Sequence, residues 1–304
     1  MDEVALAAAA LAAGRLVILP TETVYGLAAD AANAAAVAAL YAAKGRPGFN
    51  PLIAHVVDLA AAEAEGVFDE RARALARAFW PGPLTLVVPV RPRGSVCELA
   101  RAGLDTIALR APAHPLARAV LEAFAGPLAA PSANRSGRPS PTTLPDALGE
   151  VGDAAGRWLD GGPCAVGLES TVVSLLDGPP RLLRPGAVTR GDIEALVGPL
   201  AAAEDDARRS PGRLARHYAP DAPLRLEARG PRPGEAFIGF GAIGPDALNL
   251  SPAGDLDEAA ARLFSCLRAA DAMNPAAIAI APIPEEGLGE AINDRLRRAA
   301  GKVG

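Results

Sequence analysis

The sequence of 304 residues has only three cysteines, which excludes several kinds of site. Cys97, Cys164 and Cys266 are far apart and odd in number, and no CxxC pair or Cys/His spacing typical of a zinc site occurs. A zinc site or a disulfide framework is therefore not expected. So few cysteines fit a reducing compartment, and we expect the protein in the cytoplasm.

Long hydrophobic runs and an excess of positive charge are also lacking. No apolar run reaches the ~18 residues of a membrane span, and the apolar stretch 4–13 follows Asp2 and Glu3, which favours an amphipathic first helix over a signal peptide. A net charge of −5 and only 4% aromatic residues argue against stable binding of long nucleic acid. A small basic pocket for a phosphorylated ligand is still compatible with this composition.

Lysine is almost absent, since Lys44 and Lys302 stand against 28 arginines. Lys302 lies in the C-terminal tail, so Lys44 is the one lysine in the body of a chain that otherwise uses arginine. A compact ammonium and a planar guanidinium bind anions in different ways. The exception favours a functional role for Lys44, although a single residue can stand there by chance.

What is present predicts a globular α/β protein of about two domains. Half of the residues are hydrophobic and 21% are charged, enough for a core without staples. The first half alternates short apolar runs with amphipathic ones, which predicts parallel pairing in part of a sheet. We expect helices at 2–13, 33–43, 70–79, 115–124 and 192–197, and strands at 16–19, 52–57, 84–90, 106–109, 128–130, 171–176 and 181–183.

The alternation stops after residue 200 and resumes in a smaller unit. Residues 201–222 are polar and rich in Arg, Asp, Ser and Pro, which is typical of a linker. Beyond it we expect strands at 237–240 and 276–280 and helices at 256–270 and 288–300. The predicted domains are therefore 1–200 and 223–304, joined by the linker 201–222.

Polar side chains gather in four segments that carry loop residues, at 20–26, 44–55, 131–142 and 210–220. The first and third follow buried strands, and ligands of open α/β sheets bind beyond the carboxyl ends of strands. Lys44 and Arg46 flank Gly45, which breaks the helix, so both could reach one anion. Arg110 and Arg184 each end a strand. Taken singly, each segment also fits an ordinary loop, a surface arginine or a buried histidine.

The common catalytic motifs are missing. The sequence has no GxxxxGK[ST], HExxH or GxSxG and no convincing Ser–His–Asp or Cys–His set. The GxGxxG match at 239–244 is followed by Pro245 and Asp246, where a helix should begin, so it is a weak sign of dinucleotide binding. Chemistry without a protein nucleophile favours catalysis by positioning and charge stabilisation, as in nucleotidyl transfer.

Taken together, the segments resemble the Sua5/YrdC family, the threonylcarbamoyl-AMP synthases. The resemblance covers nearly the whole chain, and the matching stretches are PTETVYGL (20–27), KGRP (44–47), NPLI and His55 (50–55), WPGPLT (80–85), RAP (110–112), APSAN with Ser136–Gly137 (130–137), ESTV (169–172) and RPG (184–186). The long form of the family is matched by SPG (210–212), HYAP (217–220), GLG (287–289) and AINDRL (291–296).

The resemblance implies a fold and a reaction. The fold is a YrdC-like twisted, open mixed sheet whose concave face holds a positive cavity, followed by a linker across its mouth and a smaller Rossmann-like α/β domain. The reaction joins L-threonine, bicarbonate or CO2 and ATP into threonylcarbamoyl-AMP and pyrophosphate. The product then passes to a tRNA threonylcarbamoyl transferase that forms N6-threonylcarbamoyladenosine (t6A) at tRNA position 37.

Site residues are also implied by position within the matching motifs. Those expected to bind L-threonine are Thr23, His55, Arg110, Ala130 (through its backbone) and Ser170. Those expected to bind ATP are Arg46, Asn50, Thr106, Ser132, Ser140, Arg184 and His217. Lys44 and Arg46 are expected to act in catalysis by neutralising phosphate charge, with Mg2+ accompanying ATP and no separate metal site.

One departure and two alternatives accompany this hypothesis. Family linkers commonly read SPGMKYRHYAP, whereas Leu214 stands here for the lysine, and Arg213 either substitutes for it or the phosphate contact is lost. An RNA-binding module on the same fold is disfavoured by the acidic charge and by the few aromatic residues. A carbamoyltransferase that uses carbamoyl phosphate is disfavoured by the long-form linker and the GLG…AINDRL segment.

Overall fold

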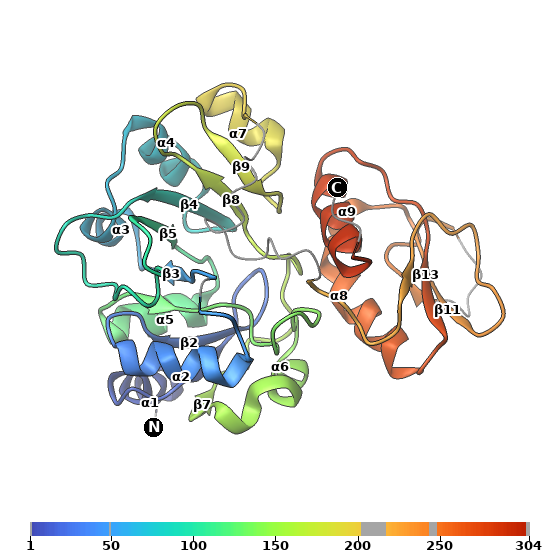
Figure 1. Cartoon of the computed structure of the whole chain (residues 1–304), viewed down its shortest axis with the longest axis horizontal. Helices are drawn as coiled ribbons and strands as arrows, with labels where there is room; N and C mark the ends of the chain where they lie inside the picture. Colours follow the sequence, from blue (N-terminus) through green and yellow to red (C-terminus); the bar gives the residue numbers. More distant parts are fainter. Residues whose placement is uncertain (1, 49, 202–216, 243–247, 302–304) are drawn as a thin grey trace.

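The computed structural model describes residues 2–48, 50–201, 217–242 and 248–301, and it places a larger sheet with its helices beside a smaller one (Figure 1). The larger sheet has nine strands in the order β7-β1-β2-β6-β3-β5-β4-β8-β9. Pairing is parallel for β1/β7, β3/β5 and β4/β8 and antiparallel elsewhere. The strands are β1 (Val17–Leu19), β2 (Gly26–Asp30), β3 (Ile53–His55), β4 (Leu84–Pro89), β5 (Thr106–Arg110), β6 (Leu128–Ala129), β7 (Arg157–Trp158), β8 (Thr171–Ser174) and β9 (Arg181–Arg184).

Helices cover this sheet unevenly. The main core lies on one face, beneath α2 (Ala34–Lys44), α3 (Leu59–Glu65), α4 (Glu70–Phe79), α6 (Leu144–Val151) and α7 (Arg190–Val197). On the other face, α1 (Glu3–Ala12) and α5 (Pro115–Phe124) pack over β1, β2 and β6 only. Among the described residues, the rest of that face carries a small apolar cluster without a helix: Ile53, Val87, Ala108, Val172 and Leu183. This uncovered part of the sheet is where a ligand has room.

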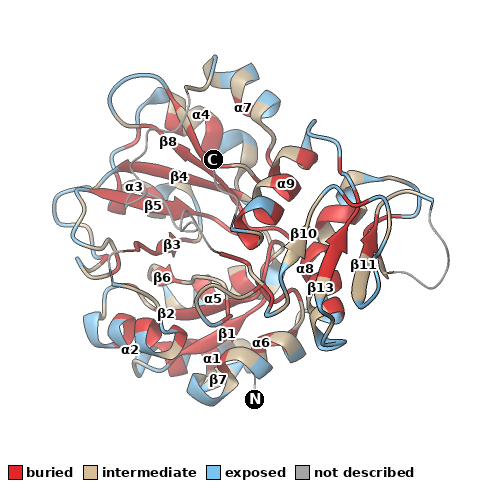
Figure 2. Cartoon of the chain, turned by 45° about the vertical axis from the view of Figure 1, so that its right-hand side comes forward, coloured by how far each residue is buried: buried red, intermediate tan, exposed pale blue. Residues whose placement is uncertain are grey.

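The smaller sheet has four strands in the order β10-β13-β11-β12, and every pairing in it is parallel. Its strands are β10 (Leu224–Arg225), β11 (Glu235–Gly239), β12 (Leu248–Asn249) and β13 (Ala277–Ile280), with the helices α8 (Leu256–Ala272) and α9 (Leu288–Ala299). Its core also contains Val24 and Leu168 from the first domain. The two domains therefore share apolar packing, with α8 and α9 on the side of the first domain (Figure 2).

The predicted fold class is confirmed, and most of the expected elements lie within two residues of their predicted bounds. Helix caps explain this accuracy: Asn33 accepts hydrogen bonds from the amides of Ala35 and Ala36, and Gly45 ends α2 in the left-handed conformation. The predicted elements did not include β2, whose GLAAD sequence lacks the β-branched residues typical of strands, or the alanine-rich α3. Helix α6 and the two-residue strands β7, β10 and β12 were also not predicted.

The linker prediction falls on residues 202–216, which lie outside the described part, so the boundaries at 200 and 222 stay predictions. The GxGxxG match follows β11, and residues 243–247 within and after it also lie outside the described part. Within the described ranges, no helix is both long enough and apolar enough to cross a bilayer.

Candidate active site

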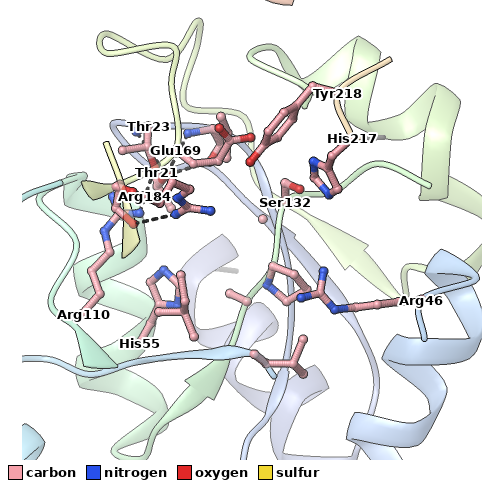
Figure 3. A pocket seen from close by; sticks show the side chains of 17 residues that line it. Thr21, Thr23, Arg46, His55, Arg110, Ser132, Glu169, Arg184, His217 and Tyr218 are labelled. Carbon is pink, nitrogen blue, oxygen red and sulfur yellow. Dashed lines mark hydrogen bonds between the residues drawn. The ribbon is translucent and has the colours of Figure 1, made fainter. Parts of the chain in front are cut away.

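A pocket opens on the uncovered face of the large sheet. It is lined by residues of the first domain and by His217 and Tyr218, which precede the second domain. Its lining residues include eight polar or charged candidates named from the sequence and three that were not named, Thr21, Glu169 and Tyr218. The lining comprises Thr21, Thr23, Val24, Gly26, Arg46, Leu52, Ile53, His55, Arg110, Ala130, Pro131, Ser132, Glu169, Ser170, Arg184, His217 and Tyr218. In Figure 3, Arg110 and His55 lie on one side of the pocket, and Arg46 and His217 on the other.

Strand geometry places Arg110 and His55 side by side. The two residues are register partners across the parallel β3/β5 pair. Because side chains alternate along a strand, Arg110 and Ala108 share the pocket face of β5, while Ile107 and Leu109 enter the main core. A buried arginine is thus held at the carboxyl end of a strand, where it needs an anion.

Arg110 already has one acidic partner. Its Nη2 donates to Glu22 Oε1 at 2.7 Å, its Nη1 to Thr23 Oγ1 at 2.9 Å, and its Nε to the carbonyl oxygen of Gly82 at 3.2 Å. Burial would raise the pKa of Glu22, but the charge and hydrogen bond of Arg110 lower it below its usual value. A guanidinium has five N–H groups, so Arg110 keeps donors for a second carboxylate.

His55 is buried and neutral. Burial, together with the charge of Arg110, lowers its pKa to about 3. Its Nδ1 is buried and has no hydrogen-bond partner. A neutral imidazole in a pocket lined by arginines can accept a hydrogen bond from a ligand amine.

Near Arg110, the pocket wall also contains a pair of hydroxyl groups and a second arginine. Ser170 Oγ lies 2.7 Å from Thr85 Oγ1, and Arg184 Nη2 donates to Ser170 Oγ at 3.1 Å. Arg184 Nε also donates to the carbonyl oxygen of Ser170, at 3.0 Å. Burial lowers the pKa of Arg184. Both hydroxyls are buried and fixed in place before any ligand binds.

Arg46 lies across the pocket in the segment after α2. Its Nε donates to the carbonyl oxygen of Asn50 at 3.2 Å and its Nη2 to that of Pro51 at 3.0 Å. Burial lowers the pKa of Arg46 to about 10, so the group still carries its charge at neutral pH. His217 follows on this side, and its ring meets that of Tyr218 edge-on, with centroids 4.0 Å apart. Tyr218 in turn packs on Phe264 of α8, at 5.6 Å between centroids.

Lys44 is placed differently from the expectation that it contacts phosphate. It is buried and does not line the pocket, and its Nζ donates hydrogen bonds to the carbonyl oxygens of Ser132 and Asn134. Burial and the nearby Arg46 lower its pKa well below the usual value. The ammonium of Lys44 therefore supports the loop that carries Ser132, and its role in catalysis beside Arg46 stays a prediction.

Three further candidates also lie outside the pocket lining. The carbonyl of Asn50 accepts hydrogen bonds from Tyr41 and Arg46, so this residue shapes the arginine's position. The hydroxyl of Ser140 donates to Glu169 Oε1. Thr106 begins β5 and, by the same alternation, faces the same side as Arg110. Arg213 lies outside the described residues.

The sequence analysis missed Glu22, Glu169 and Tyr218, although each lies within a motif that it quoted. Glu22 belongs to PTETVYGL, Glu169 to ESTV and Tyr218 to HYAP. The two acids could not be predicted as site residues, because their arginine partners are distant in the sequence.

Comparisons with known proteins agree along the whole chain. A family model described as "Telomere recombination" matches residues 9–186, and one described as "Threonylcarbamoyl-AMP synthase, C-terminal domain" matches residues 188–301. The threonylcarbamoyl-AMP synthase of Bacillus subtilis is 39% identical, over 98% of this chain and 93% of the relative. That of Pyrococcus abyssi is 39% identical, over 98% and 94%. The crystal structure of P. abyssi Sua5 complexed with L-threonine superposes with a TM-score of 0.91 at 37% identity, covering 99% of this chain and 96% of that one.

Proposed function

The chain belongs to the Sua5/YrdC family and is a threonylcarbamoyl-AMP synthase, and we propose that the pocket on its large sheet binds L-threonine beside ATP. One observation carries the proposal: a single cavity has Arg110 at one side and Arg46 and Arg184 elsewhere along its wall. An enzyme that joins two anionic substrates needs cations for both of them in one space.

We place the threonine at the His55 side. The two spare N–H groups of Arg110 can pair with its carboxylate, and Thr23 and Ser170 present hydroxyls fixed by their neighbours. The backbone of Ala130 is held to β3 by a hydrogen bond to the carbonyl oxygen of Ile53, at 3.2 Å. A structure of the P. abyssi relative holds L-threonine, which supports an amino-acid site in this fold.

We place ATP across the uncovered sheet face. Arg46, Arg184 and His217 surround the pocket, and Ser132 lies between them (Figure 3). The apolar cluster around Ile53 and Leu183 offers a surface for the base. Thr106 shares this face of β5, whereas Asn50 and Ser140 support the site through Arg46 and Glu169.

The chemistry then needs no covalent protein intermediate. The ammonium group of threonine and CO2 form the N-carboxylate with release of two protons to solvent, or the ammonium group and bicarbonate form it with release of one proton and a water molecule. One carboxylate oxygen attacks the α-phosphorus of ATP, the bond from that phosphorus to the bridging oxygen breaks, and pyrophosphate leaves. Neutral His55 can accept a hydrogen bond from the amine, while the arginines offset the repulsion between the two anions.

We propose that Mg2+ enters on the ATP phosphates. In the described part of the chain no three His, Cys, Asp or Glu side chains lie close enough together to hold a metal ion. The acid among the described lining residues, Glu169, is occupied by an arginine. The pocket therefore fits a nucleotide that brings its own cation.

We propose that the product serves t6A formation at tRNA position 37 through a separate transferase, in the cytoplasm. The free thiols of Cys97, Cys164 and Cys266 support a reducing compartment. The Sua5-type C-terminal domain favours the synthase over a carbamoyltransferase that uses carbamoyl phosphate.

The proposal is tested by measuring pyrophosphate and AMP release from ATP with each amino acid in turn. Turnover that requires both threonine and bicarbonate is expected, and turnover indifferent to threonine contradicts the proposal. A gel shift with tRNA at physiological salt tests the RNA-binding alternative, for which submicromolar binding without ATP would count.

A further inference from the structure

The second domain reaches the pocket through one fully buried side chain, Arg295 of α9. Its exposed fraction is 0%. Its Nε donates to Glu169 Oε2 at 2.9 Å, across the boundary between the domains. Its Nη1 also donates to Asp294 Oδ2 at 2.8 Å, and its guanidinium lies 5.3 Å from the centre of the Tyr218 ring.

Glu169 is the single acid among the described residues that line the pocket. Its second carboxylate oxygen accepts a hydrogen bond from the hydroxyl group of Ser140. Burial would raise its pKa, but Arg295 and then Arg184 lower it, so the carboxylate is charged. A buried negative charge beside a triphosphate is repulsive unless it is paired.

The local sequence holds α9 in the position that this contact needs. Gly289 packs so closely against the carbonyl of Pro284 that a Cβ there would overlap the oxygen. Asn293 Nδ2 donates to the carbonyl oxygen of Ile283 at 3.0 Å. Asp294 also accepts from Arg298, at 3.0 Å, so it keeps a partner of its own. The GLG and AINDRL stretches thus fix the helix that carries Arg295.

We propose that Arg295 is a positioning residue for the nucleotide: it neutralises Glu169 so that the pocket stays positive enough to bind ATP. The second domain is then part of the ATP site although Arg295 itself does not line the pocket. Without Arg295, the Glu169 carboxylate repels the phosphates and competes with them for Arg184. This inference rests on the ATP site proposed above.

The test compares kinetic constants of the full-length wild type with Arg295→Met. We expect KM for ATP to rise at least ten-fold, while KM for threonine changes less than three-fold. The double variant Glu169→Gln/Arg295→Met removes both charges and should restore KM for ATP to within about three-fold of the wild type, because an apolar or neutral replacement of a whole buried pair is tolerated.

A matched control removes another ion pair between the two domains. Arg190 Nη2 of α7 contacts Glu290 Oε1 of α9 at 2.6 Å, in a half-exposed position away from the pocket lining. Arg190→Met should leave both KM values unchanged.

Two outcomes would overturn the inference. One is a KM for ATP within two-fold of wild type in Arg295→Met. The other is a double variant as impaired as the single one, which would show that Arg295 acts through domain packing alone. Failure of the wild type to release pyrophosphate with threonine would instead contradict the proposed function, so the two failures are distinguishable.

Discussion

The two domains of this protein bury charged side chains in different places. The large mixed sheet leaves part of one face without helices, and Arg110 and Arg184 are buried there. The small parallel sheet packs an apolar core against α8 and α9. Among the described residues of the second domain, the buried charged side chains are Arg295 and Arg298, both on α9. In both domains, charge is buried where a partner or a ligand compensates it.

The difference teaches that a side chain can contribute to a pocket that it does not line. Among the described residues of 223–304 none lines the pocket, yet buried Arg295 donates a hydrogen bond to the pocket residue Glu169. Three substitutions in and around the pocket of the large sheet test how far activity and stability depend on single side chains. A fourth substitution tests an ion pair of the small sheet.

The largest effect is expected from Arg110→Met. This change removes the proposed partner of the threonine carboxylate and leaves Glu22 as a poorly exposed carboxylate without its arginine partner, held by the amide of Ala113. We expect kcat/KM for threonine to fall at least 100-fold, equivalent to about 2.7 kcal/mol. Steady-state kinetics with varied threonine measure it, and a loss of less than five-fold would remove Arg110 from the threonine site.

Lys44→Met should lower kcat/KM more than ten-fold, or above roughly 1.4 kcal/mol. The reason is that the carbonyls of Ser132 and Asn134 lose their shared donor, so the loop bearing Ser132 shifts. KM for ATP should rise more than KM for threonine. Activity like that of the wild type would show that the loop is held by other contacts.

His55 makes stability depend on pH. Its pKa is about 3 in the folded protein and near 6.5 in the unfolded chain, so only the unfolded state takes up a proton between these values. Stability should therefore fall as the pH drops below about 6.5, by up to about 1.4 kcal/mol per pH unit. Thermal melts at pH 7 and pH 5 should show a smaller decrease in Tm for His55→Gln. Equal decreases in both proteins would contradict a neutral, buried His55.

The smallest effect is expected on the second sheet. Arg225 and Glu235 pair at 2.5 Å near its edge, in a partly exposed position on β10 and β11. Because such pairs contribute little when water screens them, Arg225→Met should leave kcat and both KM values within two-fold of wild type. A larger change would mean that the far side of the second domain also influences the pocket.

The sequence could predict the fold and most of the pocket, because both rest on local signals. Caps, glycines and periodic apolar residues mark the elements, and the polar motifs follow the ends of strands that the sheet brings together. The ion pairs could not be predicted. Glu22 and Arg110 are 88 residues apart, and Glu169 and Arg295 are 126 apart. No local pattern shows which acid meets which arginine.

Lys44 illustrates the same limit. Its rarity in the composition singled it out, and the structure shows its nitrogen on the carbonyl oxygens of Ser132 and Asn134, while the expected phosphate contact stays a prediction. Which of two neighbouring cations faces the ligand depends on how the chain turns after α2. Gly45 sets that turn, and it directs Arg46 into the pocket while Lys44 stays behind the loop.

The position of Lys44 also explains why arginine does not stand at this site. Its nitrogen fits between two carbonyl oxygens that lie two residues apart in one loop. A tetrahedral ammonium can donate in both directions from a single atom, whereas the flat, wider guanidinium would push the two peptide groups apart. In a sequence that uses arginine for nearly every positive charge, lysine is therefore required at this position by the size of the donor group and not by its charge.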